Sequence, residues 1–173
     1  MDEPRVDETM NTMNYKPFLF AAFAAFVFVA CQPASNGEST NSSETVDETA
    51  GEVVDVVNDL FQAMEARDSV RLKMALHPNA LFTSVDLTGD RPMTRRTEGT
   101  AFISSVGQPG IPYVERMYDP VVEYNGDFAQ LWAYYDFSLG DSLSHCGHDA
   151  VQLVRESGQW RILGITYTRM GCE

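Results

Sequence analysis

Hydrophobic residues follow a helical spacing in the first part of the predicted domain. Apolar residues recur every three or four positions there, which predicts an amphipathic helix. They are Val53, Val57, Leu60, Phe61 and Met64. Thr49 and Glu52 fit a capping box, so the helix is expected to begin at Thr49 and to end near Ala66.

Shorter elements are predicted after this helix. Asp68 can cap a second helix that ends before Pro78, because the residue that precedes a proline disfavours helical geometry. Residues 80–86 have the composition of a first strand. Thr97 can cap a third helix, and the segment 107–110, with two glycines and a proline, ends it.

From Ile111 onward, alternation of apolar and polar residues predicts a meander of long antiparallel strands. Asn125-Gly126 is a strong signal for a two-residue hairpin loop, and Gly140-Asp141 and Ser157-Gly158 are weaker signals. If each pair forms a two-residue loop, the register of all three hairpins follows. A bulge at Pro120 would shift the first hairpin by one residue.

This register sorts the strand residues onto two faces of the sheet. The more apolar face is assigned to the side covered by the helices, and it carries Leu131, Ala133, Tyr135, Phe137, Cys146, His148, Ala150, Gln152, Val154, Leu163, Ile165 and Tyr167. The opposite face carries Trp132, Tyr134, Asp136, His145, Gly147, Asp149, Val151, Leu153, Ile162, Thr166 and Thr168.

The N-terminal segment has the features of an export signal. Phe18 to Ala30 is free of charge, is too short to span a bilayer comfortably, and follows Lys16 in a small basic region. Residues 1–30 are therefore predicted to be a signal peptide, with translation beginning at Met13. The segment ends in Val29-Ala30-Cys31, which resembles a bacterial lipobox.

The predicted mature chain begins at Cys31, which would carry the lipid. Residues 32–48 are rich in Ser, Thr, Asn and acids and have almost nothing to bury, so residues 31–48 are expected to be a flexible tether. The folded domain is expected at residues 49–173. The protein is then a membrane-anchored lipoprotein on the bacterial periplasmic side or at the cell surface.

Composition narrows the choice of partners. The 173-residue chain has 25 acidic and 12 basic residues and a formal charge of -13. Nucleic acid is not an expected partner, because binding to phosphates needs clustered Lys and Arg. Such a surface also repels anionic headgroups, so acyl chains rather than basic residues are expected to hold the protein to the membrane.

Several sequence segments resemble the nuclear transport factor 2-like superfamily, in particular its SnoaL-like polyketide cyclase and lumazine-binding-like members. The segments are Val56 to Asp68, Leu76 to Ala80, Leu131 to Ala133, Tyr135 to Phe137, Ser144 to Gly147, Gln152 to Arg155 and Trp160 to Ile162. The resemblance implies an α+β cone, in which N-terminal helices pack on a strongly curved, mostly antiparallel sheet. It implies no cofactor and leaves activity open, because the superfamily contains isomerases, dehydratases, cyclases, an epoxide hydrolase and non-catalytic binders.

Polar residues on the predicted inner face are the first candidates for a site. Tyr135, His148, Gln152 and Tyr167 are predicted to line a ligand pocket, where His148 could act as a base and Tyr135 as a hydrogen-bond donor. Alternatively, the tyrosines are core residues whose hydroxyls reach water or a backbone carbonyl. No carboxylate is expected on this face of the central strands, which weakens an analogy with ketosteroid isomerase.

A rival pair is predicted on the opposite face. Asp136 and His145 are expected directly across from each other, as are Trp132 and Asp149. Asp136 and His145 are compatible with half of a catalytic triad or with a simple cross-strand ion pair. The ion pair is favoured, because no nucleophile lies nearby. No metal site is predicted, because His145 and His148 have opposite parity on one strand.

The cysteines suggest a disulfide. With Cys31 lipidated, Cys146 and Cys172 are the remaining thiols in an exported chain. Cys146 is expected opposite Arg169, so the C-terminal tail could fold back to place Cys172 beside it. A free, buried Cys146 remains the alternative.

The resulting functional hypothesis is a membrane-tethered, exported domain that binds a small hydrophobic ligand. The enzyme alternative is a cofactor-independent lyase, isomerase or cyclase. A third alternative is a protein interaction module, and exposed Trp132 and Tyr134 would favour it or a homodimer. An ionisable group that points into the pocket would favour the enzyme.

Overall fold

The computed structural model describes residues 42–172. The predicted signal peptide, the predicted lipidation site Cys31 and the tether up to residue 41 lie outside the described residues. No helix in the described range is long and apolar enough to cross a membrane.

Three helices precede or interrupt the first strands of the sheet. They are α1 (Ser42–Glu65), α2 (Ser69–Ala75) and α3 (Gly99–Val106). Helix α1 begins before the predicted cap Thr49, because residues 42–48 contain neither Gly nor Pro to stop it. The predicted cap of α2 is confirmed, since the Asp68 carboxylate accepts hydrogen bonds from the backbone N–H groups of Val70 and Arg71.

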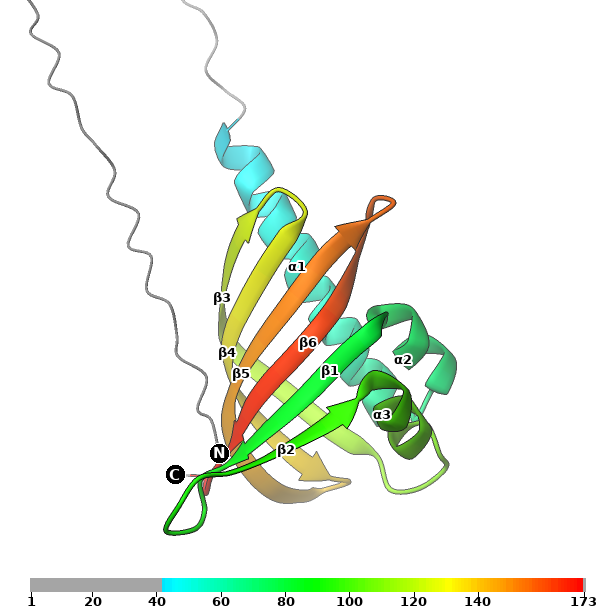
Figure 1. Cartoon of the computed structure of the whole chain (residues 1–173), viewed down its shortest axis with the longest axis vertical. Helices are drawn as coiled ribbons and strands as arrows, with labels where there is room; N and C mark the ends of the chain where they lie inside the picture. The colour runs from blue at the N-terminus through cyan, green and yellow to red at the C-terminus, as the bar shows by residue number, and fades with distance from the viewer. Residues whose placement is uncertain (1–41, 173) are drawn as a thin grey trace, which may run out of the picture. The chain divides into compact units, whose positions relative to one another are not determined.

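Six strands form one curved sheet. They are β1 (Leu76–Asp86), β2 (Met93–Glu98), β3 (Tyr113–Asn125), β4 (Phe128–Leu139), β5 (Ser142–Glu156) and β6 (Gln159–Arg169). The strand order is β2-β1-β6-β5-β4-β3. Every neighbouring pair is antiparallel except β1 and β6, which are parallel. The predicted α+β class with a mostly antiparallel sheet is confirmed (Figure 1).

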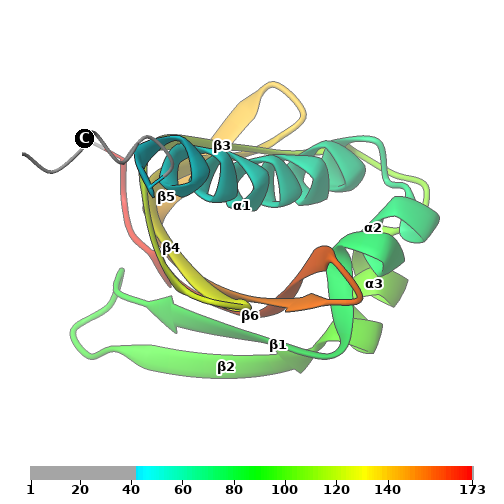
Figure 2. The same ribbon diagram turned by 90° about the horizontal axis from the view of Figure 1, so that it is seen from above.

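The sheet curls around α1, and α2 and α3 lie beyond one end of that helix (Figure 2). Buried residues of α1 pack against the concave face of β4, β5 and β6. The α1 residues are Val53, Val57, Leu60, Phe61, Ala63 and Met64, and the sheet residues include Ala129, Leu131, Ala133, Val151, Leu153 and Ile162. This packing forms the hydrophobic core, and the concave face is called the inner face below.

Strand β2 was missing from the sequence prediction. It consists of Met-Thr-Arg-Arg-Thr-Glu and is exposed along almost its whole length at the edge of the sheet, so it has no apolar alternation to detect. Thr97 belongs to this strand instead of capping α3, and Glu98 precedes the helix without a side-chain cap. The predicted cap was therefore wrong.

A bulge in the first hairpin is confirmed near Pro120. Tyr118 pairs with Tyr134 and Val121 with Trp132, so Asp119 and Pro120 together oppose a single residue of β4. The loop itself is Gly126-Asp127 rather than Asn125-Gly126, because Asn125 still pairs with Phe128.

A second bulge inverts the predicted faces of β5. Leu139 pairs with Ser142 as expected, but Phe137 pairs with His145, so Ser144 is left without a partner residue. Every later residue of β5 is therefore on the face opposite to the predicted one. His148 and Gln152 lie on the outer face, whereas Asp149, Val151 and Leu153 lie on the inner face.

A third bulge places the end of β6 on the predicted face of the sheet. Leu153 pairs with Ile162 and Gln152 with Gly164, so Leu163 is the extra residue. Ile165 and Tyr167 consequently lie on the inner face, as expected, while Ile162 is buried in the core instead of facing outward.

Candidate functional site

A cavity of about 340 Å³ lies between the inner face of the sheet and helices α1 and α3. Most of its lining is apolar or aromatic: Leu60, Phe61, Met64, Phe82, Phe102, Tyr113, Tyr135, Phe137, Leu139, Ile165 and Tyr167. The polar remainder is Glu115, Ser144, His145, Asp149 and Arg169. This combination of an apolar wall and a few convergent polar groups is typical of a small-molecule site.

Two carboxyl groups meet on the cavity wall. Glu115 comes from β3 and Asp149 from β5. Strand β4 lies between these two strands, and its residue Tyr135 pairs with Gly147 of β5. The two carboxyls are close enough for one to donate a hydrogen bond to the other when it carries a proton. Asp149 is only 2% exposed, whereas Glu115 is half-buried and is the more accessible member of the pair.

Burial controls the ionisation of this pair. It raises the pKa of Asp149 to about 7, although the hydrogen bond with Glu115 acts in the opposite direction. The pKa of Glu115 is raised well above its usual 4.5, first by burial and then by the nearby Asp149 charge. Like carboxyls in such a setting titrate as a coupled pair, and at neutral pH the pair holds at least part of one proton.

Histidine and arginine side chains occupy a second polar region of the cavity. Burial and the charge of Arg169 lower the pKa of His145 to about 4, so its imidazole is neutral at pH 7. The His145 ring packs against Phe137 in a tilted arrangement with centroids 4.9 Å apart, and its Nδ1 lies 3.1 Å from the Ser144 hydroxyl. Arg169 pairs along the strands with Asp86, which gives the guanidinium a carboxylate neighbour.

Tyr135 and Tyr167 line the cavity as predicted, but their hydroxyls differ in environment. Tyr135 is 1% exposed, and its hydroxyl donates a hydrogen bond of 2.7 Å to the backbone carbonyl of Thr168. Burial raises the pKa of both tyrosines, and at Tyr167 a hydrogen bond with Ser84 partly offsets that shift. Tyr135 therefore matches the alternative in which its hydroxyl satisfies a backbone group.

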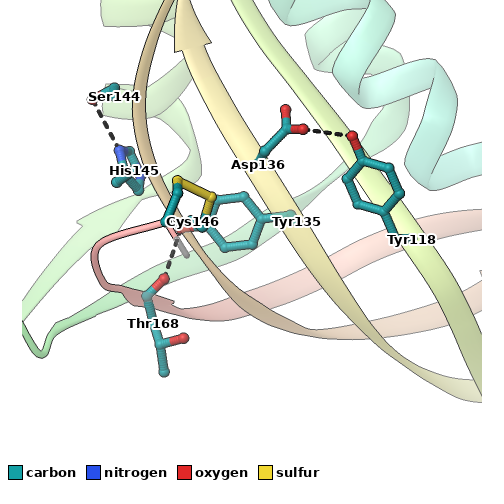
Figure 3. Close-up of a disulfide and its surroundings, with 8 residues drawn as sticks. Tyr118, Tyr135, Asp136, Ser144, His145, Cys146 and Thr168 are labelled. Carbon is teal, nitrogen blue, oxygen red and sulfur yellow. Dashed lines mark hydrogen bonds between the residues drawn. A yellow bond between two sulfur atoms is a disulfide. The ribbon is translucent and has the colours of Figure 1, made fainter.

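The close approach of β5 and β6 makes the Tyr135 contact possible. Gly147 lies where any Cβ atom would collide with the Thr168 carbonyl oxygen, so glycine is required there. Tyr135 pairs with Gly147, and Figure 3 shows its hydrogen bond to Thr168. The Thr168 hydroxyl in turn accepts a hydrogen bond of 2.8 Å from the backbone N–H of His148.

Predicted candidates on the outer face are separated from the cavity. His148 stacks on Trp132 with ring centroids 5.2 Å apart, and Gln152 faces the same side. Both were wrongly assigned to the pocket, because the bulge at Ser144 was not anticipated.

The predicted Asp136–His145 pair does not form. Asp136 pairs along the strands with Cys146 and accepts a hydrogen bond from the Tyr118 hydroxyl, whereas His145 lies opposite Phe137 on the inner face. Figure 3 shows Asp136 directed toward Tyr118 and His145 directed toward Ser144. Trp132 likewise pairs with Ala150 rather than with Asp149.

Cys146 and Cys172 form a disulfide, with their Cα atoms 5.1 Å apart (Figure 3). Cys146 exchanges two backbone hydrogen bonds with Met170, one residue beyond the predicted partner Arg169. The bridge and these bonds fix the tail that follows β6, and Arg169 at the cavity wall immediately precedes that tail.

Sequence reasoning missed both carboxyls of the site. Asp149 was placed on the wrong face by the bulge, and Glu115 was not considered because the register of β3 was left open. One signal was present: the predicted inner face of β5 contained His148 and Gln152, whereas the opposite face contained Val151 and Leu153. That pattern of apolar residues in the second half of β5 favours the observed face.

Comparisons with solved structures identify the architecture. A protein of unknown function from Mycobacterium tuberculosis is similar with a TM-score of 0.64 and 14% identity, covering 77% of this chain and 78% of the other. A nuclear transport factor 2-like protein from Cytophaga hutchinsonii gives a TM-score of 0.57 at 14% identity and coverages of 75% and 99%. The protein has the nuclear transport factor 2-like fold.

A third match is a candidate scytalone dehydratase of Novosphingobium aromaticivorans, with a TM-score of 0.57, 9% identity and coverages of 75% and 89%. No protein-family model matches the chain, and no curated protein matches it by sequence. At these identities, the nuclear transport factor 2-like fold is what the comparisons establish, and activity must be argued from the cavity.

Proposed function

We propose that this nuclear transport factor 2-like domain binds a small hydrophobic molecule in the cavity under α1. The observation that carries the proposal is the cavity of about 340 Å³, whose wall is mostly apolar and aromatic. Burial of an apolar ligand there would contribute about 25 cal/mol for each Å² removed from water. The few polar groups on the wall would orient the ligand.

A cavity-filling substitution tests this proposal. Ile165 is buried and lines the cavity, so Ile165→Trp should occupy part of the space and lower affinity for hydrophobic ligands at least tenfold. Val121→Trp is the matched control, because Val121 is 59% exposed on the sheet and is absent from the cavity wall. Binding of a hydrophobic small-molecule panel should be measured by calorimetry, with the melting temperature of each variant as a folding check. Equal binding by both variants would contradict the proposal.

The carboxyl pair supports a second candidate, a cofactor-independent lyase, isomerase or cyclase. The pKa of Asp149 is raised to about 7 and that of Glu115 well above 4.5, so the pair keeps a proton at neutral pH that is available for transfer. Glu115 is the more accessible carboxyl and would exchange the proton with the substrate. The neighbouring Asp149 carboxyl would raise the pKa of Glu115 and so keep it protonated. On this hypothesis, Glu115→Gln should abolish turnover while ligand affinity stays near the wild-type value. Retained turnover would exclude the proton-transfer role.

Export and lipid anchoring at Cys31 are part of the same proposal. The supporting observations are the charge-free segment Phe18 to Ala30 and the lipobox-like Val29-Ala30-Cys31. Intact-mass analysis after expression in a bacterium that processes lipoproteins should show loss of residues 1–30 and added acyl mass. A product that retains Phe18 to Ala30 would contradict the anchor, and Cys31→Ala should leave the folded domain unchanged.

Self-association through the outer face is a third element of the proposal. Trp132 and Tyr134 are 48% and 37% exposed there, beside His148 and Tyr118, and aromatic residues of this kind are enriched at interfaces. Sedimentation analysis should find a dimer that Trp132→Ser weakens. Met74→Ser, on the exposed side of α2, is the control and should leave the mass unchanged. A monomer at all concentrations would contradict the proposed dimer.

A further inference from the structure

The carboxyl pair on the cavity wall has no cation beside it within the described residues. None of the ion pairs within the described residues involves Glu115 or Asp149. Asp149 is almost completely buried, and its Oδ2 atom has no donor from another side chain or the backbone in the described part of the protein. A carboxyl pair with a fully buried member and no cation is costly, since burial penalises the ionised form.

The nearest guanidinium does not balance this pair. Arg169 lines the cavity and pairs along the strands with Asp86 on β1. Its charge shifts the pKa values of Asp86, His145, Tyr135 and Tyr167. Within the described residues, the charges that shift the pKa values of Glu115 and Asp149 belong to carboxyls, namely the pair itself and Asp136. The carboxyl pair and the Arg169 guanidinium both line the cavity but form no ion pair with each other in this part of the protein.

Aromatic rings surround the remaining volume. Phe61 comes from α1, Phe82 from β1, Phe102 from α3, and Phe137 and Tyr167 from β4 and β6. Aromatic faces attract a cation through their quadrupole, and more strongly when water is excluded. A wall of rings with an unpaired carboxyl pair at one end matches a ligand that has an apolar body and a positive charge.

We propose that the ligand is a small hydrophobic amine, bound as the ammonium ion between the Glu115–Asp149 pair and the aromatic rings. This inference rests on the proposed ligand-binding function of the cavity. The ammonium would donate hydrogen bonds to the two carboxylates, including the Asp149 oxygen that has no donor. The shared proton of the pair would leave to solvent on binding.

Proton release gives the binding a defined pH dependence. The titratable and charged groups of the cavity wall are Tyr113 and Glu115 (β3), Tyr135 (β4), His145 and Asp149 (β5), and Tyr167 and Arg169 (β6); α1 and α3 contribute apolar residues. Asp86 (β1) lies close enough to influence His145 and Arg169. His145 is already neutral at pH 7, and the tyrosines stay protonated. Affinity for an amine should therefore rise with pH through about 7 and fall again only as the amine loses its own proton near about pH 10.

Three probes that share a naphthyl body but carry an amine, an alcohol or a carboxylate distinguish the possible modes of recognition. Naphthylmethylamine, naphthylmethanol and naphthoate should be titrated into the full chain by calorimetry. Each titration is done in two buffers that differ in ionisation enthalpy, which reports the number of protons released. The amine should bind at least tenfold more tightly than the alcohol, with proton release. Glu115→Gln and Asp149→Asn should each reduce the preference for the amine over the alcohol to about twofold, while affinity for the alcohol stays unchanged. Glu123→Gln, an exposed residue of β3 outside the cavity wall, is the control and should retain the full preference.

Each other outcome overturns the inference in a distinguishable way. Equal affinity for the amine and the alcohol would contradict amine recognition and leave the ligand-binding function intact. Tightest binding of naphthoate would assign recognition to Arg169 instead. Proton release is measured on the wild-type protein, so its absence during amine binding would count against the proposal even if a variant failed to fold. If none of the three probes bound, both this inference and the proposed function would fail.

Discussion

The two faces of the central strands carry similar residues in opposite environments. The inner face has Asp149 beside Tyr135, and the outer face has Asp136 beside Tyr118. Asp149 is buried with the Glu115 carboxyl as its hydrogen-bonding neighbour, whereas Asp136 accepts a hydrogen bond from the Tyr118 hydroxyl. Burial raises the pKa of Asp149 to about 7. Residue type alone therefore does not distinguish these two acids; the face of the sheet does.

The largest expected effect concerns the stability contributed by the two aspartates. The folded-state pKa of Asp149 is about 7 against the usual 3.8. Burial of this carboxyl therefore lowers stability by an amount that is absent below about pH 4, grows as the pH rises to about 7 and is constant above that. Asp149→Asn should therefore stabilise the protein at pH 8 by up to about 4 kcal/mol and have little effect at pH 4. Denaturant unfolding at both pH values measures the difference.

Asp136→Asn is the matched substitution on the outer face. It weakens a hydrogen bond from Tyr118 instead of relieving a buried charge, so we expect no stabilisation at pH 8. If the two variants behaved alike at pH 8, the contrast between the faces would be wrong.

The disulfide should have the next largest effect. Cys146 and Cys172 are 26 residues apart, and a loop of this size corresponds to about 3 kcal/mol in the chain-entropy model. Cys172→Ser should lower the free energy of unfolding by about that amount. Oxidised protein with two titratable thiols would show that the bridge does not form.

The sequence predicted some features of the fold correctly and others wrongly. The helix-to-strand order, the cap at Asp68 and the bulge at Pro120 all depend on local residue chemistry, and each was predictable. The bulge at Ser144 has no local signature, because the turn at Gly140-Asp141 formed as predicted and the extra residue follows it. One unpaired residue was enough to exchange His148 for Asp149 at the site, since side chains alternate along a strand.

A hydroxyl deletion on each face sharpens the comparison further. Tyr135→Phe leaves the buried Thr168 carbonyl without its donor and should cost about 1 to 3 kcal/mol. Tyr118→Phe, on the outer face, removes a solvent-accessible hydroxyl and should have a smaller effect. Equal losses in denaturant unfolding would mean that the Tyr135 hydroxyl has water available to it.

The smallest effect is expected at His148. This side chain stacks on Trp132 outside the cavity, so His148→Gln should leave ligand affinity and any turnover unchanged. His145→Gln, which alters the cavity wall, should change affinity in the same assay. A loss of binding in His148→Gln alone would restore the register predicted from the turns.

Direct titration of the carboxyl pair tests the central claim, that Glu115 and Asp149 share a buried, apolar site on the inner face. Side-chain carboxyl carbons can be followed by nuclear magnetic resonance as a function of pH, with Glu115→Gln and Asp149→Asn to assign the signals. The structure predicts coupled titration, with Asp149 near about 7 and Glu115 well above 4.5. Independent titration of both groups near their usual values of 3.8 and 4.5 would contradict the account.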